Sequence, residues 1–309
     1  MSELARPLLE EEQIVAFLSA IEFHEYFSNN DNLTRVFGNG ANIDVAFAQS
    51  ITMIKDANND LIDVVKNNTL DSSIHRASPY KTNEEREQLR REIVDQLFQN
   101  VRPVNDDDIR YGTGGMLPSA GCVRKNREAF IIIGLPASGK SGIAAKVSDY
   151  YRAILIDSDF AKRKIPEYIK KNGAALVHNE SKMIKDEIMC ASIGMGLNFV
   201  LPIIGDDYNG VLGIIKSLKR HRYKVSIILV ELDRVKATQR AFNRFKATGR
   251  YIPLSKILDE YSNNPSLTFY KLLVNQPDLP MALINSDVSF TEKPKIVSQY
   301  NFTEIHKIV

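Results

Sequence analysis

Apolar side chains recur at helical spacing through the first hundred positions of the chain. In TNEEREQLRREIVDQLFQN, Leu89, Ile93 and Leu97 lie four residues apart, and Thr82 or Asn83 can cap the start of a helix. The stretches LLEEEQIVAFLSAIEF and NIDVAFAQSITMIKDANNDLIDVVKNN carry a similar period, and the second has room for one long helix or two. The pattern predicts a small bundle of amphipathic helices.

The hydrophobic pattern changes after the glycine-rich stretch DDDIRYGTGGMLPSAG. Five short apolar runs follow, AFIIIG, AILID, NFVLPIIG, KVSIILVEL and MALINS, and helical stretches separate them. Strands that alternate with helices are typical of an α/β fold with a parallel sheet and helices on both faces. The glycine cluster favours a linker, although such a loop can also touch a ligand. We therefore predict a helical N-terminal domain at 1–110, a linker at 111–123 and an α/β domain at 124–309.

Charge is distributed unevenly between these parts. Residues 1–110 hold 20 acidic and 11 basic side chains, a balance of −9, whereas residues 111–309 hold 18 and 29, a balance of +11. A basic domain favours phosphorylated small molecules, nucleic acid or a membrane surface as ligands, or it is simply a solvated surface. The interleaved aromatic, arginine and glycine residues of RNA-binding proteins are absent, as is any window of about 18 apolar residues. The sequence thus predicts a cytoplasmic protein that binds neither nucleic acid nor a membrane.

The first apolar run of the α/β domain ends in GLPASGKS, which fits the phosphate-binding pattern GxxxxGK[ST] without a gap. Gly134 and Gly139 permit the backbone angles that turn successive N–H groups inward, so the loop becomes an anion cradle before a helix. Lys140 then reaches the β- and γ-phosphates of ATP or GTP, and the Ser141 hydroxyl binds Mg²⁺. The predicted nucleotide-binding residues are Gly134, Pro136, Ala137, Ser138, Gly139, Lys140 and Ser141.

The second apolar run leads into IDSDF and places Asp157 and Asp159 at the carboxyl edge of the sheet, beside the phosphate loop. A carboxylate at this edge can accept the proton of an attacking hydroxyl or hold Mg²⁺. Alternatively, Asp157 or Ser158 caps the following helix. We predict that Asp159 is the general base and that Ser141 and Asp157 are the magnesium ligands.

Arginines cluster in the stretch QRAFNRFKATGRYIP. Arg240 and Arg244 lie one helical turn apart, and Arg250 follows a glycine. Phosphoryl transfer needs cations on the migrating group, and arginines supplied by the same chain provide them. Arginines are also common on protein surfaces, but this grouping favours a lid over the phosphates.

Four motifs, GLPASGKS, IDSDF, ALVHNES and NRFKATGRYIP, together resemble in order and spacing the zeta-toxin family of P-loop kinases. The resemblance implies a kinase that uses ATP or GTP. The best-known members phosphorylate the 3′-hydroxyl of the amino sugar in UDP-N-acetylglucosamine. By position, the resemblance implies phosphate and magnesium binding by Lys140 and Ser141, a general base in Asp159, and γ-phosphate contacts from Arg244 and Arg250.

The resemblance covers about residues 130–275, and within it His178 and Glu180 fall in the segment that lies near the acceptor in the family. A single histidine among apolar residues is, by its chemistry alone, more often structural. The expectation that these two residues contact the acceptor therefore depends on the resemblance.

One segment departs from the family pattern. Many zeta toxins carry Glu-Gly-Thr after the third strand, where it contacts the sugar, but this chain reads VLPIIGDD, with Pro202 for Glu and Ile204 for Thr. Asp206 or Asp207 can supply a carboxylate a few residues later, or the pocket serves another hydroxyl compound. A zeta-like group of bacterial effectors phosphorylates NAD. The expected acceptor is thus a small molecule with a hydroxyl group, either a nucleotide sugar such as UDP-N-acetylglucosamine or NAD.

Zeta toxins are usually silenced by a small helical antitoxin that covers the nucleotide site. The acidic helical segment 1–110 precedes a basic kinase, so we predict antitoxin-like inhibition in cis, with packing or oligomerisation as the alternative role. A separate small protein is the other candidate inhibitor. The alternative to a kinase is a regulatory protein that binds nucleotides without catalysis.

Overall fold

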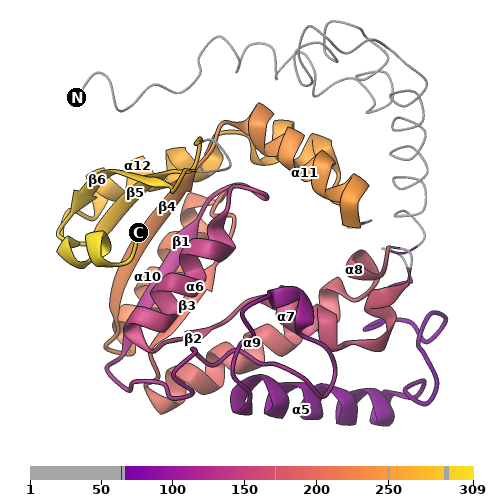
Figure 1. Ribbon diagram of the computed structural model, residues 1–309. Coiled ribbons are helices and arrows are strands. Elements are labelled where there is room, and N and C mark those ends of the chain that lie inside the picture. The colour runs from indigo at the N-terminus through magenta and orange to yellow at the C-terminus, as the bar shows by residue number, and fades with distance from the viewer. Residues whose placement is uncertain (1–63, 65–66, 171, 249–250, 289–291) are drawn as a thin grey trace, which may run out of the picture.

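The computed structural model describes residues 64, 67–170, 172–248, 251–288 and 292–309. These residues form an α/β structure in which helices flank a six-stranded sheet (Figure 1). The amphipathic helices predicted before residue 64 lie outside the described residues. None of the described helices is long and apolar enough to cross a membrane.

Five parallel strands make up most of the sheet, in the order β2-β3-β1-β4-β5-β6. The central strand β1 (Glu128–Ile133) lies between β3 (Phe199–Pro202) and β4 (Lys224–Glu231). The flanking parallel strands are β2 (Ile154–Leu155) and β5 (Met281–Asn285). Their nearly continuous apolar runs are buried because helices cover both faces of a parallel sheet. The predicted parallel sheet is therefore confirmed for all five apolar runs.

The sixth strand, β6 (Lys295–Tyr300), runs antiparallel to β5 at the edge of the sheet. The sequence pattern did not indicate this strand, because KIVSQY mixes polar and apolar residues instead of forming an apolar run. Its side chains alternate between exposed and half-buried, which is typical of an outer strand that lies against one neighbour.

Helices on the two faces follow from the handedness of the crossovers. The helix α6 (Lys140–Tyr151) leads from β1 towards the β2 edge, whereas α10 (Tyr208–Arg220) and α12 (Asn264–Asn275) lead towards the β5 edge. Right-handed crossovers therefore put α6 on the face opposite α10 and α12 (Figure 1). The helices α10 and α12 pack on each other and on β4, and the 3-10 helix η4 (Thr303–Lys307) ends the described chain.

The chain between β2 and β3 is helical. Its elements are α7 (Ser158–Lys164), the 3-10 helix η2 (Pro166–Ile169), α8 (Gly173–Leu176) and α9 (His178–Met195). The helices α7 and α9 pack on each other and form a layer beside the sheet with η2 and α8 (Figure 1). The predicted helix after IDSDF is thus present, but it ends before Pro166, which lacks a backbone N–H.

Helix α5 (Asn83–Gln99) confirms the helix predicted from the four-residue spacing. Thr82 caps it in a capping box, as expected for this sequence. Leu89, Ile93 and Leu97 are fully buried, and α5 packs on α7 and α9. These three side chains belong to the same hydrophobic core as the sheet.

The stretch between α5 and β1, which includes the 3-10 helix η1 (Asp106–Asp108), packs against the edge strand β2. The N–H of Leu155 donates to the carbonyl of the fully buried Met116 over 3.0 Å. A Cβ on Gly115 would lie 2.2 Å from the carbonyl oxygen of Asn100, so only glycine fits there. The division into helical domain, linker and α/β domain stays a prediction, and the two sides of the predicted linker share one core.

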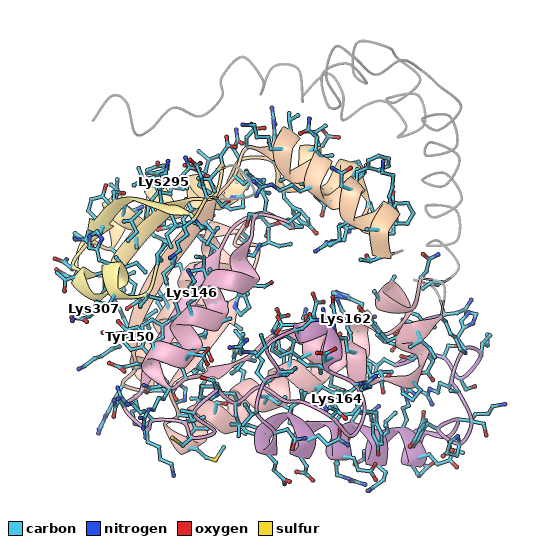
Figure 2. All side chains as sticks on the ribbon, viewed as in Figure 1. Lys146, Tyr150, Lys162, Lys164, Lys295 and Lys307 are labelled. Atoms are coloured by element: carbon cyan, nitrogen blue, oxygen red, sulfur yellow. The ribbon has the colours of Figure 1, made fainter. Side chains whose placement is uncertain are left out.

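Lys164 joins α7 to the same stretch (Figure 2). Its side chain is fully buried, and Nζ donates to Gln96 Oε1 and to the carbonyls of Arg110 and Thr113, each over 3.0 Å. Burial lowers the pKa of this lysine to about 8. All three acceptors are neutral, so this ammonium is held by hydrogen bonds rather than by an ion pair.

A second, smaller hydrophobic core lies between α11 (Arg234–Thr248) and the π-helical turn η3 (Lys256–Tyr261). It contains Phe242 and Ile257 from these elements and Leu135 from the phosphate loop. The unit formed by α11 and η3 is therefore packed directly on the loop that the sequence assigns to phosphate binding.

Candidate active site

The loop between β1 and α6 has the strained backbone that its glycines allow. Gly134 has φ +151°, and a Cβ there would lie 2.4 Å from the carbonyl oxygen of Val230. Gly139 has φ +87° and caps the N-terminus of α6. Ala137 also has a positive φ, 62°, a conformation that side-chain-bearing residues rarely adopt outside functional loops. The geometry agrees with a loop that turns its N–H groups towards an anion at a helix N-terminus.

Lys140 folds back over this loop. Its Nζ donates to the carbonyls of Gly134 and Leu135 over 2.5 and 2.6 Å. The pKa of the ammonium is lowered to about 7, mainly by burial and also by Arg244, while Asp157 and Asp159 oppose the shift. A lysine that interacts electrostatically with these three residues lies in one cluster with them. Four residues predicted from distant segments are therefore brought together beside the phosphate loop.

Asp157 and Asp159 have different local roles. Asp157 caps α7, because its Oδ1 accepts the N–H of Asp159 over 2.9 Å, which was the alternative foreseen from the sequence. The carboxylate of Asp159 is 28% exposed, and its Oδ1 accepts from Lys162 Nζ over 2.9 Å. Lys162 lies on the same helix, one turn further on (Figure 2). A solvent-accessible carboxylate at this position can reach a substrate hydroxyl.

The arginines of α11 differ in their contacts. Arg244 interacts electrostatically with Lys140, as expected for a residue that faces the phosphates. Arg240 instead donates to the carbonyl of Ser286, just beyond β5, over 3.1 Å. Arg250, the other predicted γ-phosphate residue, lies outside the described residues.

His178 begins α9 and reaches solvent. Desolvation by the surrounding protein lowers the pKa of its imidazole, and Lys162, Lys182 and Lys256 lower it further, while Asp159 opposes them. The imidazole therefore lies among cationic side chains and in electrostatic reach of Asp159. The motif ALVHNES alone did not reveal that cationic side chains surround His178.

Glu180, the other residue assigned to the acceptor by resemblance, is fully buried and ion-paired with Arg86 and Arg90. Its Oε2 also accepts from the hydroxyl of Thr69 over 2.7 Å. A carboxylate enclosed in this way has no surface for a substrate. The expected contact between Glu180 and the acceptor therefore disagrees with the structure, because α5 and the chain before it occupy that side of α9.

The segment after β3 carries the two candidate carboxylates. Asp206 is exposed and interacts electrostatically with Tyr261 of η3. Asp207 caps α10 by accepting the N–H groups of Asn209 and Gly210. Asp207 thus has a structural role, and Asp206 is the carboxylate that can face a ligand.

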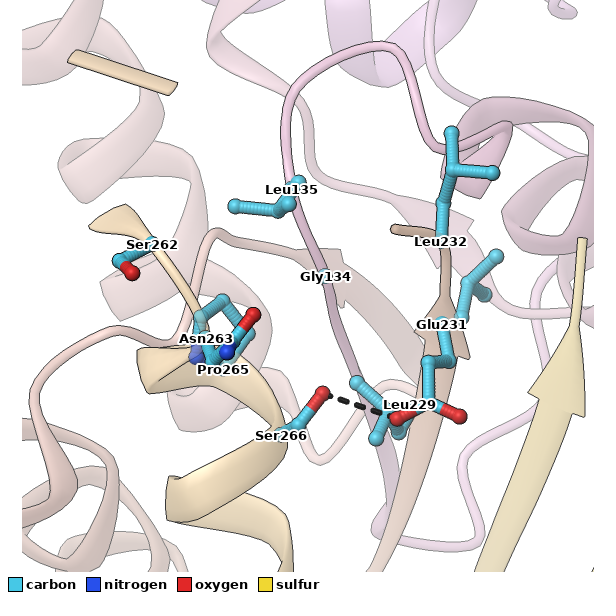
Figure 3. Close-up of a pocket in the computed structure, with 10 residues that line it drawn as sticks. Gly134, Leu135, Leu229, Glu231, Leu232, Ser262, Asn263, Pro265 and Ser266 are labelled. Carbon is cyan, nitrogen blue, oxygen red and sulfur yellow. Dashed lines mark hydrogen bonds between the residues drawn. The ribbon is translucent and has the colours of Figure 1, made fainter. Parts of the chain in front are cut away.

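Behind the phosphate loop lies a polar cavity of about 10 Å³, close to the space that one water molecule needs (Figure 3). Glu231, at the end of β4, accepts a hydrogen bond from the Ser266 hydroxyl over 3.0 Å there. Burial raises the pKa of this carboxyl. Glu231 was not among the residues predicted for the site, although it is the first charged residue after the buried run VSIILV. Gly134 and Leu135 line the same cavity, so Glu231 lies close to the phosphate loop.

Within the described ranges, no group of three or more histidine, cysteine or acidic side chains is arranged to hold a metal ion. Mg²⁺ does not require such a group, since it commonly binds phosphate oxygens and waters with one or two protein ligands. Ser141 is exposed in the first turn of α6, and Asp157 interacts with the neighbouring Lys140. These two side chains fit a magnesium ion held mainly by a bound nucleotide.

Comparisons with known proteins bear on the family and the fold of this chain. A family profile described as Zeta toxin matches residues 120–275. A solved structure from the PezAT chromosomal toxin-antitoxin system of Streptococcus pneumoniae is similar, with a TM-score of 0.52 and 11% identity over 74% of this chain and 87% of that chain. The AvrRxo1-ORF1:-ORF2 complex with ATP has a TM-score of 0.50 and 16% identity, over 75% of this chain and 74% of that chain. No curated protein sequence matches.

At these identities the structural likeness concerns the fold alone. The native AvrRxo1-ORF1:-ORF2 complex has the same TM-score of 0.50 and 16% identity. The fold class predicted from the sequence, a P-loop kinase-type sheet with helices on both faces, is confirmed.

Proposed function

Since this chain belongs to the zeta toxin family, we propose that it is a kinase that transfers the γ-phosphoryl group of ATP, or of GTP, to a hydroxyl group of a small molecule. The observation that carries the proposal is the cluster in which Lys140 interacts with Asp157, Asp159 and Arg244 beside the phosphate loop. Phosphoryl transfer needs cations at the migrating group and a carboxylate at the attacking hydroxyl, and this cluster contains both.

In the proposed reaction, Asp159 accepts the proton of the acceptor hydroxyl as its oxygen attacks the γ-phosphorus. A new O–P bond forms, the bond between the γ-phosphorus and the bridging β,γ-oxygen breaks, and the nucleoside diphosphate leaves with that electron pair. Lys140 exchanges the carbonyls of Gly134 and Leu135 for phosphate oxygens, and Arg244 neutralises charge on the transferred group. Arg250 is proposed for the same role from its position in the sequence.

Ser141 and Asp157 would hold Mg²⁺ together with the nucleotide phosphates. The ion neutralises negative charge on the β- and γ-oxygens when it is bound. Asp157 is already oriented by the N–H group of Asp159, so its carboxylate can serve the ion without a change in α7.

For the acceptor we propose a compound that carries phosphate, a nucleotide sugar such as UDP-N-acetylglucosamine, with NAD as the alternative. The cationic surroundings of His178 support an anionic acceptor, since Lys162, Lys182 and Lys256 act on this imidazole. His178 and Asp206 are the proposed acceptor contacts. We further propose that a separate small protein, or the part of the acidic segment 1–110 that precedes residue 67, inhibits the enzyme in the manner of an antitoxin.

The test is detection of a phosphorylated product by mass spectrometry after incubation with Mg-ATP and UDP-N-acetylglucosamine, NAD or a metabolite extract. Product is expected from the wild-type protein and from Asp186→Asn, an aspartate of α9 whose side chain is 45% exposed and which pairs only with its neighbour Lys185 in the contacts described. Asp159→Asn should form none. Tight nucleotide binding without any product would instead favour the non-catalytic, regulatory alternative.

A further inference from the structure

A buried ion-pair cluster joins α5 to the helical layer that carries the proposed catalytic base. The guanidinium of Arg86 is fully buried and contacts the carboxylates of both Glu167 and Glu180. Its Nη1 and Nη2 each donate to one oxygen of Glu167 over 2.9 Å. Its Nε and Nη2 donate to Glu180 over distances between 2.6 and 3.0 Å. One arginine thus binds two glutamates in forked geometry, which a lysine cannot reproduce.

The cluster is balanced in charge and closed by further contacts. Arg90 adds a second cation at 3.2 Å from Glu180, so two arginines face two glutamates. The N–H of Ala77 donates to Glu167 over 2.6 Å, and the Thr69 hydroxyl donates to Glu180. Buried charges are tolerated only when such partners satisfy them. We name these residues the Arg86 clasp: Thr69, Ala77, Arg86, Arg90, Glu167 and Glu180.

Each of the two glutamates lies near a residue of the proposed active site. Glu167 lies in η2, directly after α7, whose first turn carries Asp159. Glu180 lies in the first turn of α9, two residues after His178. Arg86 therefore holds η2 and the first turn of α9 together. The short helix α8 lies in the chain between these two points.

We propose that Arg86 is a positioning residue of the kinase, which holds Asp159 and His178 at the correct separation by binding Glu167 and Glu180 together. This inference rests on the proposed kinase activity. Arg86 and Arg90 precede the family match, which begins at residue 120, so the working enzyme includes the chain from at least Thr69 onwards. If α5 belonged to a detachable inhibitory domain, weakening its contacts would raise the kinase activity instead of lowering it.

The test uses Arg86→Lys in the full-length chain, because lysine keeps the buried positive charge but binds both carboxylates without the fork. The matched control is Arg91→Lys, whose arginine lies on the same helix and makes an exposed pair with Glu87, both side chains being 59% exposed. We expect Arg86→Lys to bind ATP with unchanged affinity and to lose at least about tenfold in kcat/KM for UDP-N-acetylglucosamine or NAD, whichever the wild type phosphorylates. Arg91→Lys should match the wild type.

Three results would overturn the proposal. Unchanged kinetics in Arg86→Lys would mean that the forked contacts of Arg86 do not position Asp159 and His178. A parallel loss of ATP binding and turnover, in proportion to the folded fraction, would mean that the clasp only stabilises the fold. A gain in activity would mean that α5 restrains the enzyme.

A readout without turnover separates this inference from the proposed function. Hydrogen–deuterium exchange of the backbone between η2 and the first turn of α9 should be faster in Arg86→Lys than in Arg91→Lys, while exchange in the phosphate loop stays equal. If the wild type transfers phosphate to neither compound, the proposed acceptors fail. The exchange result then still tests whether Arg86 holds η2 and the first turn of α9 in place. Equal exchange in the two variants would then refute it.

Discussion

The lowered pKa of Lys140 makes nucleotide binding dependent on pH. With a pKa of about 7, the lysine is about half neutral at pH 7 and about nine-tenths neutral at pH 8. Phosphate oxygens favour the charged ammonium, so the bound state holds the proton throughout this range. Binding should therefore take up about 0.5 proton at pH 7 and about 0.9 at pH 8.

The same linkage gives the change in affinity. The fraction of protein with a charged Lys140 falls about tenfold from pH 6 to pH 8, and the apparent affinity falls by the same factor, or about 1.4 kcal/mol. The sign follows from the lowered pKa, since raising the pH removes a proton that the bound form requires. A lysine with its ordinary pKa would give no change in this range.

Isothermal titration calorimetry measures the proton uptake directly, from the binding enthalpy of a non-hydrolysable ATP analogue with Mg²⁺ in two buffers of different ionisation enthalpy. Lys140→Met should lose the uptake, whereas Lys146→Met, an exposed lysine on the same helix, should keep it. A wild-type enthalpy that is independent of the buffer at pH 8 would refute the reasoning. So would equal uptake by wild type and Lys140→Met, because the proton would then bind elsewhere.

Two further substitutions test the packing. Ile93→Ala should lower the free energy of unfolding by about 2–5 kcal/mol in urea denaturation, because the side chain is fully buried, and the exposed Gln88→Ala should change it by less than about 0.5 kcal/mol. An effect of Ile93→Ala below about 1 kcal/mol would contradict the shared core. Gly134→Ala should weaken nucleotide binding at least about tenfold in a fluorescence titration, since its Cβ would lie 2.4 Å from the Val230 carbonyl oxygen. Gly142→Ala, with nothing within 4 Å, should bind normally and gain stability, and equal affinities for the two variants would contradict the strain argument.

The sequence predicted the elements whose local pattern is strong. The four-residue spacing of Leu89, Ile93 and Leu97 identified α5, and unbroken apolar runs identified the five parallel strands. The phosphate loop was recognisable because its glycine spacing is required by the turn itself. These patterns are local in the sequence, so they can be recognised without knowledge of the tertiary structure.

The missing parts depend on contacts between distant segments. β6 has only a half-buried, alternating pattern, and its pairing is set by β5. Glu180 matched the acceptor segment by its position, but the sequence did not reveal that Arg86 lies against it, 94 residues earlier. Glu231 followed an apolar run as a single charge and carried no motif. The roles of Asp159 and Arg244 stay predictions, although the structure brings both near Lys140.

The contact between Met116 and Leu155 has a consequence for behaviour at high concentration. A bare edge strand offers unpaired N–H and C=O groups to another molecule and so promotes aggregation. On the β2 side, the carbonyl of Met116 takes the N–H of Leu155, and the chain around it lies along that edge. On the other side, the outer strand β6 begins with the exposed Lys295, and a lysine on an edge strand disfavours strand addition (Figure 2). Loss of the covering segment would therefore expose a short, apolar edge strand through which two molecules can associate.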